Sequence, residues 1–200
     1  QETLSEGLQL KFPNIRSYKG LSAQGSKVFF SFSSGTKTQL SATFMYPSSG
    51  GFTFLEKSKN TSQYTLYTAD NSGNKDFTCD TFTGAIGDNI RASAGSMTAK
   101  YSQEKGTNAA AKTIVKTYRL AVAASGEYTQ YHGGTVAGAL AAINATVTRI
   151  NAVFGRDLGV QLSLVASTTN VIYTDPETDP FGSDLNNEIQ ATLTANIGEA

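Results

Sequence analysis

The chain has 200 residues with 16 lysines and arginines against 16 aspartates and glutamates, and only 16% of its residues are charged. This balance excludes the basic surface of a nucleic-acid-binding protein and the acidic run of a solvating tail. No apolar stretch approaches the ~20 residues of a membrane span. A single cysteine excludes an intrachain disulfide framework. We therefore expect neither a nucleic acid nor a membrane among its partners.

The first third of the chain has the pattern of antiparallel strands. Between Lys27 and Ala69, aromatic and β-branched residues alternate with polar ones. The sequence PSSGG at residues 47–51 is typical of a turn. Four strands are expected, at residues 28–32, 40–46, 52–55 and 64–67. Their close spacing predicts an antiparallel meander.

Residues 84–112 interrupt this pattern with a stretch rich in glycine, alanine and serine, in which lysines stand among small residues. Such a composition buries little apolar surface, so it favours a mobile linker that a protease can cut. An ordinary long surface loop is the alternative interpretation.

The pattern changes again after the linker. Residues 113–123 are rich in Val, Ile and Tyr and predict a strand, and a second strand is expected at residues 160–165. Between them, apolar residues recur at spacings of three and four, which is typical of one face of a helix. These residues are Val136, Leu140, Ile143, Val147, Ile150 and Phe154. The order predicts a right-handed βαβ unit with parallel strands.

The C-terminal residues add a loop and a second helix. Residues 171–173 extend or follow the second strand, and residues 174–180 form a turn-rich loop. The helix begins near Ser183 or Asp184. Its apolar face carries Leu185, Ile189, Leu193 and Ile197. The expected fold is α+β in two parts, a β-rich antiparallel part followed by an incomplete α/β part. Two strands and two helices cover a parallel sheet poorly, so we expect the natural chain to continue.

The residues themselves offer no catalytic constellation. His132 is the single histidine, and a zinc or copper site normally gathers several ligands, so a surface or capping histidine is expected. Asp175, Glu177 and Asp179 could touch calcium, but they fit no EF-hand spacing and suit a solvated acidic turn better. The two sequons, at Asn60 and Asn144, are weak signals, and the second lies in an expected helix.

Three segments of the N-terminal part carry a family resemblance. They are LQLKFPNIRSYKG at residues 8–20, the dipeptide Gly51-Phe52 after the expected turn, and KDFTC at residues 75–79. In this order they resemble the prodomain of bacterial reprolysin-like zinc metallopeptidases, which belong to the metzincins. The resemblance implies that residues 1–83 are a β-rich prodomain and that residues 84–112 are the maturation region.

Later segments resemble the beginning of the catalytic domain of the same family. They are residues 118–123, 126–128, 143–151, 154–158 and 184–198. The resemblance implies that residues 113–200 are the N-terminal portion of a metzincin-like catalytic domain. The family's motif His-Glu-x-x-His-x-x-Gly-x-x-His, whose histidines hold zinc, is absent from these 200 residues.

The resemblance implies a secreted zinc metalloendopeptidase precursor that hydrolyses peptide bonds by a metal-activated water. Its partners would be protein or peptide substrates and the remainder of its own catalytic domain, and the zinc would be bound by residues outside this chain. The prodomain would keep the enzyme latent until a cut within residues 84–112 released it. The fragment alone is expected to be inactive.

Cys79 is the candidate latency ligand. A prodomain thiolate can take the open coordination position of zinc, and Cys79 lies just ahead of the expected linker, within reach of such a site. A plain core or surface cysteine is the alternative. For the whole chain, one rival function is a non-enzymatic adhesion or carbohydrate-binding β-domain, which an exposed row of Phe52, Phe54, Tyr64 and Tyr67 would favour. The other is an inhibitor in which the prodomain folds and acts alone.

Overall fold

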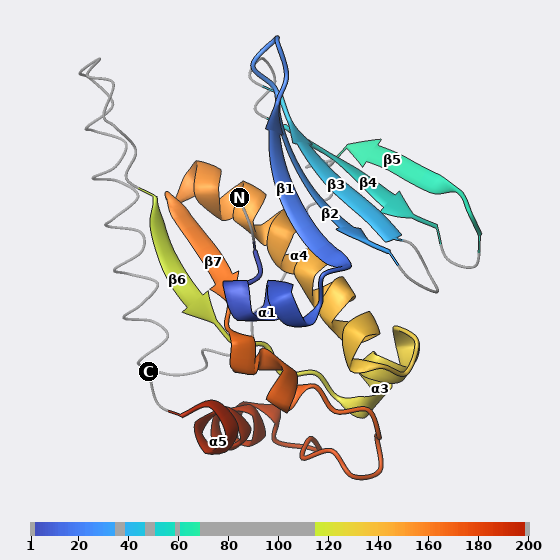
Figure 1. Cartoon of the computed structure of the whole chain (residues 1–200), viewed down its shortest axis with the longest axis vertical. Helices are drawn as coiled ribbons and strands as arrows, with labels where there is room; N and C mark the ends of the chain where they lie inside the picture. The colour runs from blue at the N-terminus through green and yellow to red at the C-terminus, as the bar shows by residue number, and fades with distance from the viewer. Residues whose placement is uncertain (1–2, 35–38, 47–50, 59–60, 69–114, 199–200) are drawn as a thin grey trace. The chain divides into compact units, whose positions relative to one another are not determined.

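A computed structural model describes residues 3–34, 39–46, 51–58, 61–68 and 115–198 of the chain (Figure 1). All of them belong to one compact unit that combines the N-terminal and C-terminal parts of the sequence. The strands are β1 (Ile15–Leu21), β2 (Lys27–Ser33), β3 (Gln39–Met45), β4 (Phe52–Lys57), β5 (Tyr64–Thr68), β6 (Lys116–Leu120) and β7 (Val160–Leu164). The helices are α1 (Glu6–Lys11), α3 (Gly126–Tyr131), α4 (Val136–Asp157), α5 (Leu185–Ile197) and the 3₁₀ helix η1 (Ala166–Val171).

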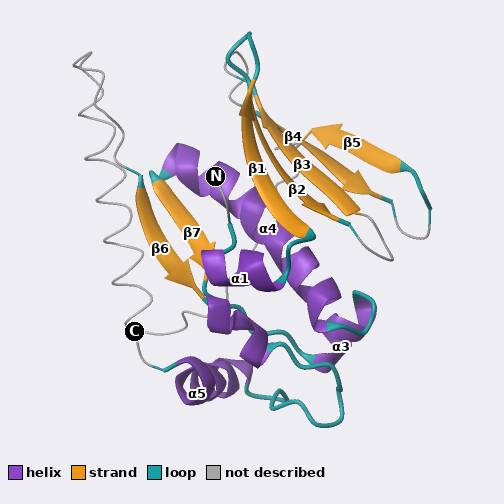
Figure 2. Cartoon of the chain, in the orientation of Figure 1, coloured by secondary structure: helices purple, strands orange, loops and turns teal. Residues whose placement is uncertain are grey.

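The N-terminal strands form one antiparallel sheet in the order β1-β2-β3-β4-β5 (Figure 2). The predicted meander and its four expected strands are therefore confirmed as β2 to β5, whereas β1, which precedes them, was not predicted. On β1 the two buried side chains are Ile15 and Ser17, while Tyr18 and Lys19 are exposed. A serine and a lysine on the inward face of β1 hide the apolar alternation by which the other strands were recognised.

The C-terminal part contains the predicted βαβ unit. Strands β6 and β7 are parallel, with Lys116 opposite Val160 and Leu120 opposite Leu164. The strand expected over residues 113–123 is shorter, and the predicted helix is α4, which ends at Asp157. Beyond it, Gly159 has a φ of 64°, a left-handed conformation that suits glycine after a helix. An α+β architecture is thus confirmed.

The segment expected to extend the second strand takes a different course. The 3₁₀ helix η1 follows β7 directly, and Ile172 then pairs with Ala124 in an isolated parallel bridge. The loop expected over residues 174–180 leads into α5, whose N-cap is Asp184 as predicted. Glu188 accepts hydrogen bonds from the backbone N–H groups of Gly182 and Asp184, and these bonds stabilise the N-terminus of the helix.

Helix α4 is buried on two sides. Leu140, Ile143 and Val147 face an aliphatic core that also includes Leu164 of β7. Another side meets the antiparallel sheet, where Ala152 packs with Phe29, so the helix lies along that sheet in Figure 1. By length and composition alone α4 would also suit a membrane span. A core helix passes the same test, and the packing of α4 against both sheets is that of a core helix.

The N-terminus of the chain enters the C-terminal sheet. The N–H of Ser5 donates to the carbonyl of Leu164 at 3.0 Å, and the N–H of Leu164 donates to the carbonyl of Thr3 at 2.7 Å. Leu4 and Leu164 form an isolated parallel bridge, so residues 3–5 lie beside β7, on the edge that does not face β6. Unpaired strand edges tend to associate with other chains, and these residues cover this edge from within the molecule.

Candidate functional interface around helix α4

His132 has the structural role expected of it. It is the C-cap residue of α3, and its ring lies 4.5 Å from that of Tyr128 and 4.9 Å from that of Tyr131, measured between centroids. Partial burial lowers the pKa of the imidazole below its ordinary value, because burial disfavours the charged form. Burial likewise raises the pKa of Tyr128. The pair is a packed aromatic contact at a helix end.

The acidic residues of the loop before α5 bind backbone groups of the protein. Asp179 accepts a hydrogen bond from the N–H of Gly126 at 2.6 Å and another from the N–H of Phe181 at 2.9 Å. Asp175 accepts from the N–H of Glu177 at 3.0 Å. A carboxylate at the start of α3 is favourable because helix N-termini carry free N–H groups and partial positive charge. These bonds hold the loop in place.

No group of three or more His, Cys, Asp or Glu side chains within the described ranges is placed to hold a metal ion. Cys79, the predicted latency ligand, lies outside the described residues, as do the boundaries expected at residues 83 and 113. The chemistry of a zinc site is therefore absent from the described part of the chain. The described residues instead form an extensive interface, in which α4 and β7 pack against residues 3–68. We call it the α4 interface.

Buried polar residues also cross the α4 interface. The hydroxyl groups of Thr3 and Thr148 lie 3.0 Å apart, and the N–H of Thr3 donates to the hydroxyl of Ser17 at 2.7 Å. Asn144, which is 1% exposed, donates from its side chain to the carbonyl of Arg16 at 3.3 Å. Buried polar groups are costly unless paired, so these bonds fix one alignment of the sheet on the helix. The burial of Asn144 also rules out its sequon as an accessible acceptor in the folded chain.

The side chain of a further asparagine hydrogen-bonds to the backbone at the edge of β7 that does not pair with β6. The side chain of Asn151 accepts from the N–H of Leu162 at 2.7 Å and donates to the carbonyl of the same residue at 2.8 Å. Leu162 and Leu164 are two positions apart, so their backbone groups point to the same edge. This edge is therefore satisfied partly by α4 and partly by residues 3–5.

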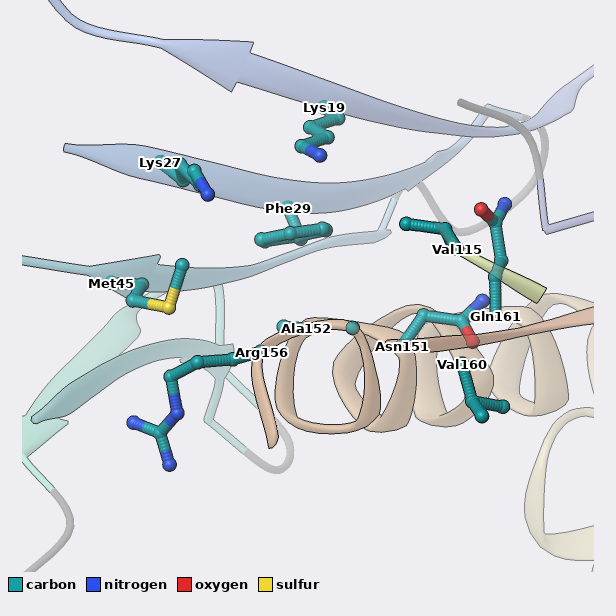
Figure 3. Close-up of a pocket in the computed structure, with 11 residues that line it drawn as sticks. Lys19, Lys27, Phe29, Met45, Val115, Asn151, Ala152, Arg156, Val160 and Gln161 are labelled. Atoms are coloured by element: carbon teal, nitrogen blue, oxygen red, sulfur yellow. The ribbon is translucent and has the colours of Figure 1, made fainter. Parts of the chain in front are cut away.

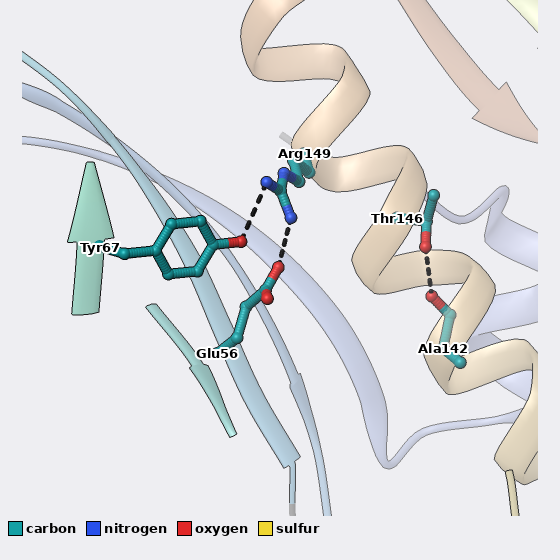
Figure 4. Close-up of polar contacts among 5 residues, drawn as sticks. All are labelled: Glu56, Tyr67, Ala142, Thr146 and Arg149. Atoms are coloured by element: carbon teal, nitrogen blue, oxygen red, sulfur yellow. Dashed lines mark hydrogen bonds and ion pairs between the residues drawn. The ribbon is translucent and has the colours of Figure 1, made fainter. Parts of the chain in front are cut away.

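Arg149 joins α4 to strands β4 and β5 (Figure 4). It forms an ion pair with Glu56 and donates to the hydroxyl of Tyr67 at 3.1 Å. Its guanidinium carbon also lies 3.8 Å from the centroid of the Phe54 ring. A guanidinium can stack on an aromatic face while its edge binds a carboxylate, which an ammonium group cannot do. One side chain thus recognises three residues of the sheet.

Arg156 makes a similar contact two helical turns further on. Its guanidinium carbon lies 4.1 Å from the centroid of Phe52, and it is bonded to Asp157. It borders a cleft between the sheet and the end of α4, which Lys19 and Lys27 also line (Figure 3). Lys19 lies over the Phe29 ring at 5.4 Å. Two of the three cations that line the cleft, Lys19 and Arg156, therefore lie over aromatic rings of the sheet.

The aromatic row that would favour an adhesion or carbohydrate-binding domain is divided. Phe52 and Phe54 are buried with 8% and 7% of their surface exposed, against Ala152 of α4. Tyr64 and Tyr67 remain partly exposed at 41% and 37%, and Tyr67 packs on Phe54. A sugar-binding platform needs its rings open to solvent, so half of this row is unsuited to that function.

The comparisons with known proteins bear on the second part of the interface. Residues 113–200 match the model of a family described as metallo-peptidase family M12B, reprolysin-like. This part of the chain is similar to the reprolysin-like metallopeptidases. The matched range includes β6, α3, α4, β7, η1 and α5. No curated protein and no solved structure matches the chain.

The match confirms the resemblance of the later segments at the level of the family, whose members are in general zinc-dependent peptidases. It does not extend to residues before 113, so a prodomain in that region stays a prediction. The structure adds what sequence reasoning missed, namely that Arg149 and Arg156 bind the sheet. Their spacing of seven residues, which places both on one side of a helix, was the only available signal.

Proposed function

We propose that the chain is part of the precursor of a secreted zinc metalloendopeptidase. In this proposal residues 113–200 are the N-terminal portion of the catalytic domain and residues 1–83 are the prodomain. The observation that carries it is the match of residues 113–200 to the reprolysin-like M12B metallopeptidases. That range also contains the parallel βαβ unit that the spacing of its apolar residues predicted.

No described residues fit a zinc ion, so no step of peptide hydrolysis is derived from them. Zinc ligands and the general base would belong to residues outside this chain, and the substrates would be proteins or peptides. The described residues would instead support the catalytic domain, because residues 3–68 complete its hydrophobic core around α4. Assistance in folding is a role that this packing supports directly.

The experiment that tests the class uses the full-length natural product. We expect the coding sequence after residue 200 to contain His-Glu-x-x-His, the purified product to contain about one zinc ion per chain, and casein hydrolysis to stop when a chelator is added. A zinc-free product that hydrolyses no peptide, obtained from a coding sequence without that motif, would reject the proposal.

Latency would be tested at Cys79. If its thiolate occupies the open zinc position, Cys79→Ala should give a precursor that is active before maturation, while zinc content stays unchanged. Cys79→Ser is the matched variant, since it keeps size and polarity but is a much weaker zinc ligand. A Cys79→Ala precursor with intact zinc and no more activity than the wild type would show that the cysteine is not the switch.

A further inference from the structure

The aliphatic core is shared between residues that lie far apart in the chain. Leu4, Leu8 and Ile15 pack in one cluster with core residues that follow position 115, among them Leu140 and Leu164. Leu8 and Leu164 are both 0% exposed. Residues 69–114 connect residues 3–68 to residues 115–198. A cut in that segment would leave every contact of this cluster in place.

The backbone and the rim of the interface add to the cluster. The backbone of residues 3 and 5 hydrogen-bonds to Leu164 of β7, which ties the N-terminus to the edge of that strand. At the rim, Arg149 binds Glu56 and stacks on Phe54. A buried apolar centre surrounded by polar contacts is the arrangement of stable interfaces between separate chains. The α4 interface has this arrangement within one chain.

We infer that residues 3–68 and residues 115–198 remain bound to each other after the chain is cut between residues 69 and 114. A single cut therefore yields a two-chain complex, and the N-terminal part leaves only when it is unfolded or digested. The inference rests on the proposed function in one respect, because it treats that cut as the maturation event. It replaces the expectation that cleavage within residues 84–112 is enough to release the catalytic part.

The test uses the whole chain with a recognition sequence for a site-specific protease inserted within residues 84–112. After cutting, denaturing electrophoresis should show two fragments, while native mass spectrometry and size-exclusion chromatography should show one species that contains both. Addition of denaturant should separate them. Fragments that elute separately in native buffer directly after the cut would overturn the inference.

Arg149 provides a variant that should weaken the complex without unfolding the uncut chain, since it lies at the partly exposed rim. We expect Arg149→Ala to raise the dissociation constant of the cut fragments roughly 10-fold, through loss of the ring stacking and the ion pair. Arg119→Ala is the matched control, because Arg119 is an exposed arginine of β6 on the same fragment and should change the constant less than about 2-fold. Equal effects of the two variants on the dissociation constant would show that Arg149 does not contribute to binding between the fragments.

The measurement needs neither zinc nor peptidase activity, so the two proposals can fail separately. Fragments that separate would overturn the inference even if the full-length product proves to be a zinc peptidase. A stable cut complex together with an inactive, zinc-free full-length product would keep the inference and reject the proposed function.

Discussion

The two halves of helix α4 are held by different chemistry. Its first half, with Leu140, Ile143 and Val147, lies in an aliphatic cluster that is almost without exposed surface. Its second half meets the phenylalanines of the antiparallel sheet, and Arg149 and Arg156 cover their rings. We call these the aliphatic end and the arginine end of α4.

The two ends show that a helix can be held against a sheet without a continuous apolar face. At the aliphatic end, stability depends on the volume that is filled and on removal of apolar surface from water. At the arginine end, the ion pair of Arg149 and Glu56 is partly exposed, and such pairs are weakened by salt. The aliphatic end should therefore dominate stability, while the arginine end sets the alignment.

The largest effect is expected from Leu8→Ala. Leu8 is 0% exposed in the aliphatic cluster, so its truncation leaves a cavity and should lower the free energy of unfolding by about 2–5 kcal/mol. The control is Leu10→Ala on the same short helix, where Leu10 is 78% exposed and a change within about 0.5 kcal/mol is expected. Urea denaturation of both variants measures the difference. Equal losses would mean that the aliphatic end does not dominate.

A smaller loss is expected from Thr148→Val, which acts between the two ends. The substitution removes the hydroxyl that lies 3.0 Å from that of Thr3 and leaves the buried Thr3 hydroxyl without this partner. An unpaired buried hydroxyl costs about 1–3 kcal/mol. Thr146→Val is the control, since Thr146 is exposed and its hydroxyl donates to the carbonyl of Ala142 within α4 (Figure 4). It should change stability by less than about 0.5 kcal/mol, and a similar loss in both variants would contradict the role of Thr3.

Much of the fold could be predicted from the sequence, because the longer elements bury one regular face. The period of α4 and the alternation in β2 and β3 were correct. Helix α1 was missed because its six residues bury only Leu8, which makes no periodic pattern. Helix α3 was missed for a similar reason, since its buried residues are Gly126 and Thr129. A periodic pattern reveals an element only when several of its buried side chains are apolar. Helices α1 and α3 are short, and the buried residues of α3 are small or polar, so neither gives such a pattern.

The interface itself could not be predicted. Arg149 and Glu56 are separated by 93 positions, and nothing in a local pattern joins them. A charged residue on a helix is normally read as solvent-exposed, so the arginine end of α4 was assigned no role. Asn144 and Thr148 were equally hidden, because helix α4 is buried on more than the single apolar face that was predicted. Long-range pairing of this kind becomes visible only when the sheet is placed on the helix.

The arginine end is tested by Arg149→Lys in the uncut chain. Lysine keeps the charge, but it cannot stack on Phe54 and bind Glu56 and Tyr67 together. We expect a loss of about 0.5–1 kcal/mol in the free energy of unfolding at low salt. Salt screens the ion pair more than it screens stacking on a ring. The part of the loss that comes from the ion pair should therefore shrink as salt is raised, and the part that comes from stacking should remain. Full retention of stability would show that charge alone is needed at this position.

The smallest effect is expected from His132, which adjoins the aliphatic end through Tyr128. Burial lowers the pKa of His132 in the folded chain, so the unfolded chain takes up the proton first as the pH falls. Stability should therefore decrease as the pH falls through about 6.5, the ordinary value of an unfolded histidine, and continue to decrease until the folded form is also protonated.

Because His132 is the single histidine, its titration can be followed by NMR without ambiguity, and its midpoint should lie below about 6.5. In His132→Gln the dependence of the urea midpoint on pH between about 5 and 7 should be reduced, since the group that links protons to folding is gone. A midpoint at or above the ordinary value would mean that the contact with Tyr128 does not bury the ring. The stability of the aliphatic end would then not depend on the protonation of His132.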